Sequence, residues 1–533
     1  MKRIRDLKLG FNDASSYRLR ENKKMFENFF VRTDDITKLI DPNVSFLVGD
    51  KGTGKTAYAV YLSNAEYKNT SSFIKFISET EYQKFVELKK SKHLVLSDYS
   101  SIWKVILYLL LAEKIRSQNT ENFLLKTFSK LNCLYEAIDE FYASAFAPEI
   151  LNAISFVEDS KIAADLFSKH LKAGGEERKT VEFSEQRMQI NLFYIQKKFE
   201  EAFRSIKLKK NMILFIDGID VRPSFLSQMD YLECIKGLAS AIWSMNNDFF
   251  PSLKDPIGRM KVVLLARPDI FNSFGLQNQN AKLIDNSVLL NWHTTYPEHR
   301  GSKIFEIADK ILKSQQEREV RDRLKIGDSW DYYFPYKIIK ATGEDPSFIS
   351  FLRYAIYRPR DIITMMKIMQ QHIPKLGQSP VCFEKKNFDN AQVKRAYSAY
   401  FLGEIKDYMS FYYELNEYDL FVFFFTFLDG SCSFTYDVYL EVFEKFKKTY
   451  EDELDNISEV FHTEEKFLQF LYELNVINYI QTTYDGKLFF NWCFKDRNQS
   501  NLNPKVKLGQ RYEVHYALGK ALNLGSRFEK GVY

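Results

Sequence analysis

The chain is poor in cysteine and proline, which narrows the kinds of protein it can be. Of its 533 residues, five are cysteines and 13 are prolines. The cysteines are scattered and form no C-x-x-C pair, so the sequence indicates neither a disulfide framework nor a thiolate zinc site and fits a reducing compartment. The shortage of proline favours a helix-rich protein. The cysteines are Cys133, Cys234, Cys382, Cys432 and Cys493.

Long apolar segments are also missing. The two longest apolar runs, 106–112 and 420–428, are far shorter than the ~20 residues that a membrane-spanning helix needs. The charged N-terminal residues 1–6 are not followed by the apolar stretch of about 7–15 residues that a secretory signal contains. We therefore expect a cytoplasmic protein with no membrane partner.

The chain has little excess charge of either sign. Its 75 Lys and Arg against 70 Asp and Glu give a formal net charge of +5, far below that of a dedicated nucleic-acid coat. Hydrophobic residues make up 45% and charged residues 27%, which is typical of a folded globular protein. The 47 Phe and 32 Tyr predict large aromatic cores. This length predicts about three or four domains.

One segment carries most of the chemical information. Residues 44–48 are a short strand-like run, followed by the pattern G-x-x-x-x-G-K-T at 49–56 and a helical pattern at 57–63. Glycines let successive backbone N–H groups turn inward around phosphate oxygens, and the helix adds its positive end. We expect Lys55 to reach the β- and γ-phosphates and Thr56 to ligate Mg²⁺. The alternative is a glycine turn before a core helix. The expected nucleotide-binding residues are Gly49, Asp50, Lys51, Gly52, Thr53, Gly54, Lys55, Thr56 and Ala57.

A second motif supplies the acid that a phosphate-binding loop needs for its metal. The apolar run 212–216 ends in Asp217, which fits a Walker B carboxylate that holds Mg²⁺. The alternative is a buried strand that ends in an Asp217-Gly218 turn. No Glu follows Asp217, so Asp220 is the nearest candidate for the base that orients water.

A third apolar run points to a residue that senses the γ-phosphate. Residues 261–266 predict a strand beside the Walker B strand, and Arg267 follows it directly. Arg267 is therefore our candidate sensor; the alternative is a solvated loop arginine. Residues 284–290 predict another buried strand. The sequence contains no N-K-x-D segment for reading guanine, so ATP is preferred over GTP.

About 160 residues separate the first two motifs, several times what one βαβ crossover needs. Residues 73–77 and 94–96 predict short strands, and 102–115 predict an apolar helix. The pattern at 115–210 is helical with few breakers and indicates a helical insertion. This insertion is either a surface for a partner or for self-association, or a bulky elaboration of the core.

Residues 301–405 predict a helical lid. Within it, Pro359 stands at the first turn of an expected helix, a position that suits proline. Arg358 or Arg360 at this helix start could reach a γ-phosphate. The alternative is that both are surface arginines paired with carboxylates.

Residues 406–500 have the order helix, helix, helix, hairpin, which resembles a winged helix. Residues 484–486 give the hairpin turn signal. The exposed positions of the third helix are mostly acidic, which disfavours DNA binding through it because carboxylates repel phosphates. These positions are Glu464, Glu465, Gln469 and Glu473, beside Lys466.

The last segment, 501–533, predicts a C-terminal helical tail. Within it, 511–524 would form a helix with His515 and Leu518 on one face. His515 is expected to pack rather than to bind a ligand, and none of the seven histidines has metal-ligand spacing.

These features together predict an α/β protein. Residues 1–300 would form a P-loop NTPase domain with a mainly parallel sheet and a large helical insertion, followed by the lid, the winged helix and the tail. The motifs at 49–56, 216–223 and 265–268, with the winged helix, resemble bacterial P-loop ATPases close to the STAND and KAP groups of the AAA+-like assemblage.

The resemblance implies a Mg-dependent ATPase that switches conformation or assembly, often in prokaryotic conflict systems such as antiphage defence. ATPases of this kind commonly receive an arginine from a neighbouring subunit, and Arg222 is our candidate. The alternative is that Arg222 pairs with Asp220 or Asp217 in its own subunit. We find no repeat array and no attached nuclease, protease or TIR segment, so a homo-oligomer with a separate effector or sensor protein is expected.

Two other functions stay open at the sequence level. The first is a nucleic-acid-associated motor or loader, for which basic clusters such as 207–210 provide the argument, although a solvated charged face is the commoner explanation of such clusters. The second is an ATP-binding scaffold that hydrolyses weakly, for which the missing Glu after Asp217 provides the argument.

Overall fold

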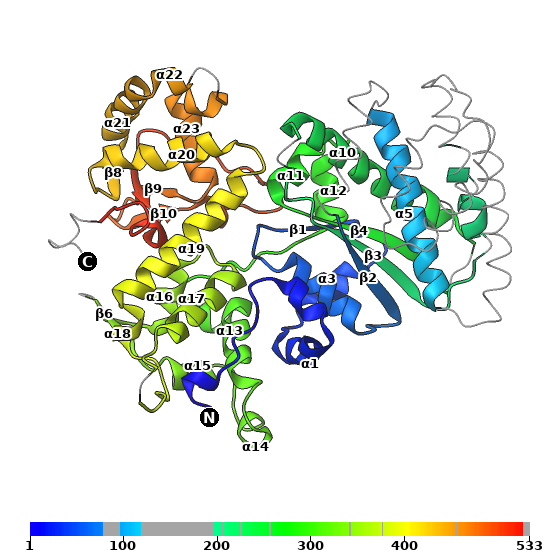
Figure 1. Ribbon diagram of the computed structural model, residues 1–533, viewed down its shortest axis with the longest axis horizontal. Helices are drawn as coiled ribbons and strands as arrows, with labels where there is room; N and C mark the ends of the chain where they lie inside the picture. The colour runs from blue at the N-terminus through cyan, green and yellow to red at the C-terminus, as the bar shows by residue number, and fades with distance from the viewer. Residues whose placement is uncertain are drawn as a thin grey trace, which may run out of the picture. The chain divides into compact units, whose positions relative to one another are not determined.

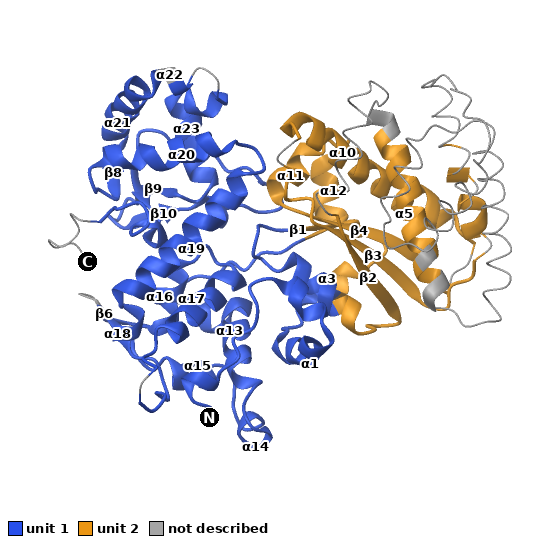
Figure 2. Ribbon diagram, in the orientation of Figure 1, with its two compact units in different colours: residues 1–36, 49–61, 289–533 blue, residues 37–48, 62–288 orange. Residues whose placement is uncertain are grey.

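The computed structural model describes residues 1–77, 96–118, 193, 196–197, 199–204, 206–223, 226–254, 257–340, 343–375, 377–454 and 457–525. The chain forms two compact units (Figure 2). Unit 1 comprises Met1–Ile36, Gly49–Tyr61 and Leu289–Tyr533, and unit 2 comprises Thr37–Val48 and Leu62–Val288. These units do not correspond to the predicted domains, because Met1–Ile36 and the glycine-rich segment Gly49–Tyr61 group with the C-terminal part of the chain.

Unit 2 is built on a five-stranded sheet in the order β2-β3-β4-β1-β5 (Figure 1). Strand β2 is parallel to β3, β3 to β4, and β4 to β1. Strands β3 and β4 are buried almost throughout, which explains why both are continuous apolar runs. The strands are β1 Phe46–Val48, β2 Thr70–Phe76, β3 Asn211–Asp217, β4 Met260–Ala266 and β5 Ser287–Leu289.

The sequence located these strands well, with two exceptions. The predicted strands at 73–77, 212–216 and 261–266 are confirmed. The strand expected at 284–290 is shorter, because 284 and 285 end helix α12 (Gln279–Asp285). The strand expected at 94–96 is not supported at its last residue, since Leu96 begins helix α5, and 94–95 lie outside the described residues.

The three central strands end at the same edge of the sheet. Val48 of β1 lies beside Ala266 of β4, and Leu264 of β4 lies beside Ile216 of β3. The chain therefore leaves β1 for the glycine-rich loop at the edge where Asp217 ends β3. Carboxyl edges of parallel sheets are the usual place for ligand sites.

Helices α5 (Leu96–Gln118) and α10 (Gln228–Ser244) pack against each other in unit 2. The Trp103 indole donates a hydrogen bond to the Cys234 carbonyl at 3.1 Å. A Cβ on Gly237 would lie 2.5 Å from the Tyr99 Cβ, so this close approach requires glycine. The predicted apolar helix at 102–115 is confirmed within α5. Most of the expected insertion at 115–210 lies outside the described residues.

The helices predicted within 301–405 are confirmed in unit 1. Helix α17 starts at Pro359 as expected. Trp330 is fully buried in an aromatic core with Phe305, Phe348 and Phe351. A short hairpin of β6 (Lys337–Lys340) and β7 (Gly343–Pro346) was not predicted. The helices are α1 Arg20–Phe29, α2 Asp34–Leu39, α3 Lys55–Asn64, α13 Lys303–Lys313, α14 Arg318–Arg321, α15 Asp328–Tyr333, α16 Ser347–Tyr354, α17 Pro359–Gln371, α18 Lys385–Phe388 and α19 Ala391–Met409; α2 and α3 run across unit borders.

The C-terminal part of unit 1 combines helices with a four-stranded sheet in the order β10-β9-β11-β8, whose neighbours are antiparallel. Strands β9 and β10 form the expected hairpin after helix α23. The elements are α20 Leu415–Phe424, β8 Ser433–Thr435, α21 Tyr436–Thr449, α22 Glu451–Leu454, α23 Glu464–Glu473, β9 Ile477–Thr482, β10 Leu488–Asn491, α24 Cys493–Asp496 and β11 Arg511–Val514.

The prediction of a C-terminal helix at 511–524 is wrong, because the segment begins with a strand that pairs in the sheet. Residues 511–514 form strand β11, which pairs with both β8 and β9, and within the described residues up to 525 a short 3-10 turn follows at Tyr516–Leu518. Two neighbouring strands provide hydrogen bonds that outweigh the local helical pattern. His515 does pack, as expected: its ring stacks on Phe401 with centroids 4.8 Å apart.

Among the described residues, no helix is both long and apolar enough to cross a membrane.

Candidate functional site

The glycine-rich segment forms a loop between β1 and α3, and Lys55 is the first residue of the helix. Gly52 and Gly54 have φ angles of +88° and +100°, a backbone region that favours glycine. The Thr53 hydroxyl donates to the Asp50 carbonyl at 2.8 Å and closes the loop on itself. The strand, loop and helix that the sequence predicted are therefore present.

The Lys55 side chain lies against this loop and is only 6% exposed. Its ammonium donates to the Gly49 carbonyl at 2.8 Å and to the Asp50 carbonyl at 3.3 Å. Thr56 follows in the first turn of α3 and is half-buried. The Trp292 indole donates to the Thr53 carbonyl at 2.8 Å and fixes the far side of the loop. The loop thus holds a buried cation at the N-terminus of a helix.

Both predicted lid arginines contact the loop backbone. The Arg358 guanidinium donates to the Lys51 carbonyl at 2.9 Å and makes a two-point pair with Asp361. Burial alone lowers the pKa of Arg358, but the Asp361 carboxylate outweighs it and the net shift is upward. The Arg360 guanidinium pairs with Glu404 at 3.1 Å. The pairing with carboxylates that the alternative interpretation expected is thus observed, although Arg358 is buried rather than at the surface.

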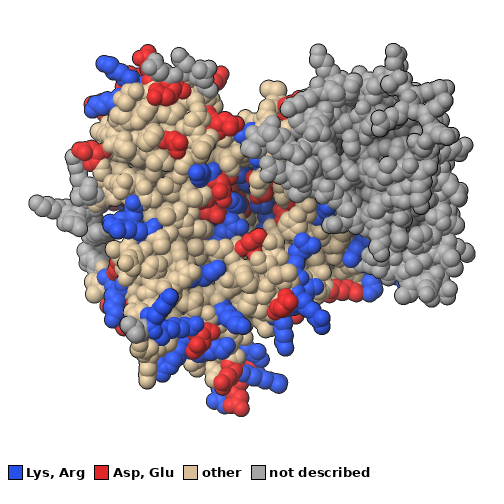
Figure 3. Space-filling model, in the orientation of Figure 1, with Lys and Arg blue, Asp and Glu red and all other residues tan. Residues whose placement is uncertain are grey.

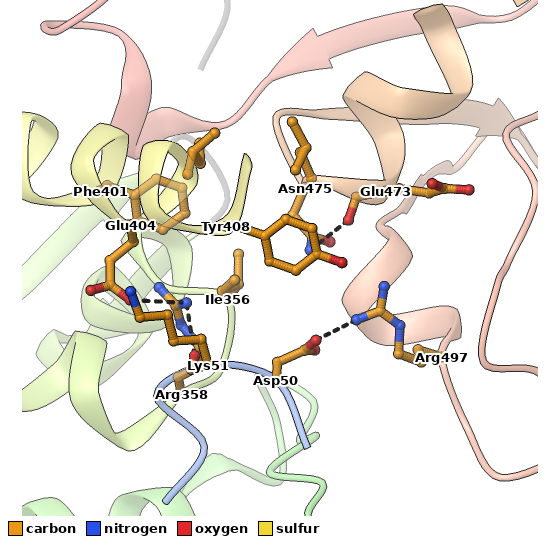
Figure 4. A pocket seen from close by; sticks show the side chains of 12 residues that line it. Asp50, Lys51, Ile356, Arg358, Phe401, Glu404, Tyr408, Glu473, Asn475 and Arg497 are labelled. Atoms are coloured by element: carbon orange, nitrogen blue, oxygen red, sulfur yellow. Dashed lines mark hydrogen bonds and ion pairs between the residues drawn. The ribbon is translucent and has the colours of Figure 1, made fainter. Parts of the chain in front are cut away.

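Two further ion pairs reach the loop from the C-terminal part of unit 1. Asp50 pairs with Arg497 at 2.6 Å, and Lys51 pairs with Asp407 of α19 at 2.5 Å. Asp50 and Arg497 point toward each other at the edge of a small cavity (Figure 4). The cavity, of about 30 Å³, is also lined by Tyr408 and has room for about one water molecule.

In unit 2, Asp217 ends β3 as a buried carboxylate that accepts the Gly218 N–H at 2.8 Å. Gly218 has a φ of +91°, and a Cβ there would lie 2.8 Å from the Ile77 carbonyl oxygen. Ile77 in turn donates its N–H to the Asp217 carbonyl at 2.9 Å. The close approach of this chain segment explains why no Glu can follow Asp217 without a backbone shift.

The loop after Gly218 carries the other predicted acid and the predicted trans arginine. Asp220 and Arg222 are both half-buried. The Tyr231 hydroxyl donates to the Ile219 carbonyl at 2.8 Å and to the Val221 carbonyl at 3.0 Å, which fixes the backbone around Asp220. The Arg222 guanidinium donates to the Leu226 carbonyl.

Arg267 is fully buried, which overturns the alternative of a solvated loop arginine. Its guanidinium makes a two-point pair with Asp269, at 3.1 Å and 2.6 Å. Pro268 starts helix α11 (Pro268–Ser273), so Arg267 is held between the end of β4 and the start of that helix.

The entry to β1 is held by a buried lysine that the sequence did not single out. The Lys261 ammonium donates to the carbonyls of Leu39, Asp41 and Val44 at 2.7, 2.5 and 3.1 Å. Burial lowers the pKa of Lys261 to about 7. These bonds fix the segment that leads into the glycine-rich loop.

The described residues contain no group of three or more His, Cys, Asp or Glu side chains that could hold a metal by themselves.

Comparisons with protein-family profiles, curated protein sequences and solved structures find no match to this chain.

Sequence reasoning missed the residues that hold the loop from outside. Arg497 is 447 positions from Asp50, and Trp292 and Asp407 are likewise distant from the residues they contact. No local spacing marks such partners. An acid inside a phosphate-binding pattern was the one available signal, because it calls for a compensating cation.

Proposed function

We propose that the protein is a Mg-dependent ATPase that acts as a nucleotide-controlled switch. The observation that carries this proposal is the loop at 49–54, where Gly52 and Gly54 have positive φ and the buried Lys55 ammonium lies against loop carbonyls at the start of α3. A loop of this kind cradles phosphates with backbone N–H groups and a lysine. ATP is preferred over GTP because no guanine-reading segment is present.

In this proposal each site residue has a defined role. Lys55 binds the β- and γ-phosphates, and Thr56 and Asp217 hold Mg²⁺. Asp220 orients the attacking water, and Arg267 senses the γ-phosphate. When bound, the metal would neutralise developing charge on the phosphates. Arg358 and Arg360 would act as lid arginines.

The finer architecture belongs to the same proposal. We interpret residues 301–405 as a lid and 406–500 as a winged helix. The order of helices and the β9–β10 hairpin after α23 support this interpretation. On the face seen in Figure 3, basic and acidic side chains are intermixed, which does not favour nucleic acid as the partner.

The biological role follows from the resemblance. A cytoplasmic homo-oligomer that works with a separate effector or sensor, in a conflict system such as antiphage defence, is the role we propose, with Arg222 as the arginine supplied in trans. A weakly hydrolysing scaffold is the second candidate, and the close approach of Gly218 to Ile77, which excludes a Glu at that position, favours it.

The test is nucleotide binding and phosphate release by the purified chain. We expect Mg-dependent ATP turnover that Lys55→Ala abolishes together with most of the binding, because the substitution deletes the charge on the phosphates. Lys385→Ala, which removes an exposed lysine of the same unit, serves as the matched control and should behave as wild type. Wild-type turnover by a folded Lys55→Ala variant would overturn the site assignment.

A further inference from the structure

An acid stands inside the phosphate-binding pattern, at the second position of the loop. The Asp50 backbone carbonyl lies 3.3 Å from the Lys55 ammonium, so this residue borders the proposed phosphate site, and its carboxylate is directed at Arg497. A negative charge there repels phosphates, and the repulsion is strong where water is scarce. Anion binding by this loop therefore needs a cation that compensates Asp50.

Arg497 is that cation. Its guanidinium is 8% exposed and pairs with Asp50, which is 21% exposed, at 2.6 Å. The guanidinium also donates to the Leu502 carbonyl at 3.1 Å and to the Cys493 sulfur at 3.4 Å, so its position is fixed independently of Asp50. Arg497 directly follows α24, in the segment after the β9–β10 hairpin.

The neighbouring ion pair, between Lys51 and Asp407, is more exposed to solvent. Lys51 and Asp407 are 25% and 61% exposed, and an exposed pair of this sort contributes little. It is screened by solvent and lies one residue farther along the loop. The Arg497–Asp50 pair is therefore a buried contact, whereas the Lys51–Asp407 pair is an ordinary surface ion pair.

We propose that Arg497 is a positioning residue of the nucleotide site, which neutralises Asp50 and so lets the loop bind phosphate. The inference rests on the proposed function and adds that the C-terminal part of unit 1 completes the anion site. If the Arg497–Asp50 ion pair only held the loop in place, removing either partner would break the same contact and would change anion affinity in the same direction. Charge compensation instead predicts opposite effects of the two substitutions on anion affinity.

Arg497→Ala leaves an uncompensated carboxylate beside the phosphates, and we expect it to weaken binding of Mg·ADP on the order of tenfold. Asp50→Asn leaves a fixed, uncompensated guanidinium there, so affinity should rise. The double variant, which carries neither charge, should return to within about threefold of wild type, because the substitutions act through one shared interaction. Glu459→Gln, which removes an exposed carboxylate paired with Lys466 in the same unit, is the matched control and should leave affinity unchanged.

The experiment is calorimetric titration of the full chain and these four variants with Mg·ADP and, separately, with inorganic pyrophosphate, which has no base or ribose. Thermal unfolding of each variant checks its fold. If Arg497→Ala does not fold, Asp50→Asn alone still decides, because unchanged or weaker binding by that variant contradicts charge compensation. Equal losses in both single variants, without rescue in the double variant, would also overturn the inference.

Failure of this inference is distinguishable from failure of the proposed function. If the wild-type chain binds neither probe, the nucleotide site itself is wrong and the inference falls with it. If the wild-type chain binds, Lys55→Ala does not, and the Asp50 and Arg497 variants show same-signed losses, only the role of Arg497 is wrong.

Discussion

Placing a side chain after Asp217 should destabilise unit 2, and the structure gives the size of the effect. In Gly218→Ala, the new Cβ would sit 2.8 Å from the Ile77 carbonyl oxygen and 3.3 Å from its nitrogen, in a backbone with φ of +91°. A left-handed conformation costs a non-glycine residue about 1–2 kcal/mol. Displacing Ile77 also weakens its 2.9 Å hydrogen bond to the Asp217 carbonyl, a loss of about 1 kcal/mol. We expect a total of about 3 kcal/mol.

Gly275→Ala is the control that isolates the steric part. Gly275 also lies in unit 2 and has a φ of +62°, but a Cβ there would meet nothing within 4 Å. It should therefore cost about 1–2 kcal/mol, from backbone conformation alone. Urea unfolding of both variants, followed by hydrogen exchange at β3, measures the difference. If Gly218→Ala is no more destabilising than Gly275→Ala, the steric explanation for the missing Glu is refuted.

The remaining predictions concern pH and turnover. Burial lowers the pKa of His515 to about 4; since the unfolded chain binds this proton near pH 6.5, stability should fall as pH drops from about 6.5 to 4, by up to about 3 kcal/mol. His515→Phe should flatten that slope whereas His462→Gln should not, and an unchanged slope in His515→Phe would assign the pH dependence elsewhere. Asp220→Asn should still bind ATP but lose turnover by ~10²-fold or more, as losses of a general base do; phosphate release at the wild-type rate would move the base to another residue.

The parts of the fold that the sequence predicted are those that local pattern determines. Strands β3 and β4 are buried on both faces and are therefore continuous apolar runs, and α17 begins at a proline. Strand β11 was missed because its identity depends on β8 and β9, which are far away in the chain. Its residues 512–514 are all buried, so no alternation of buried and exposed positions marks the strand, and the sequence around them also fits a helical repeat.

The features of the candidate site also fall into those that local sequence predicts and those that depend on distant parts of the chain. The glycine-rich loop between a strand and a helix could be predicted because glycine, lysine and threonine at fixed spacing form a local pattern. The burial of Arg267 and the contacts of Arg358 with the loop backbone could not, because they depend on packing between distant segments. Sequence reasoning therefore found the loop but not the residues that hold it.

Two departures from an ordinary phosphate-binding pattern acquire physical reasons only in three dimensions. Gly218 stands where a Glu is usual because the Ile77 carbonyl occupies the space that a Cβ would need. Asp50 pairs with the buried Arg497, which in our proposal neutralises it. The first is a steric constraint that no charge can relieve, so any water-orienting base must come from another position. The second is a balance between two charges. Removing Asp50 and removing Arg497 should therefore change phosphate affinity in opposite directions.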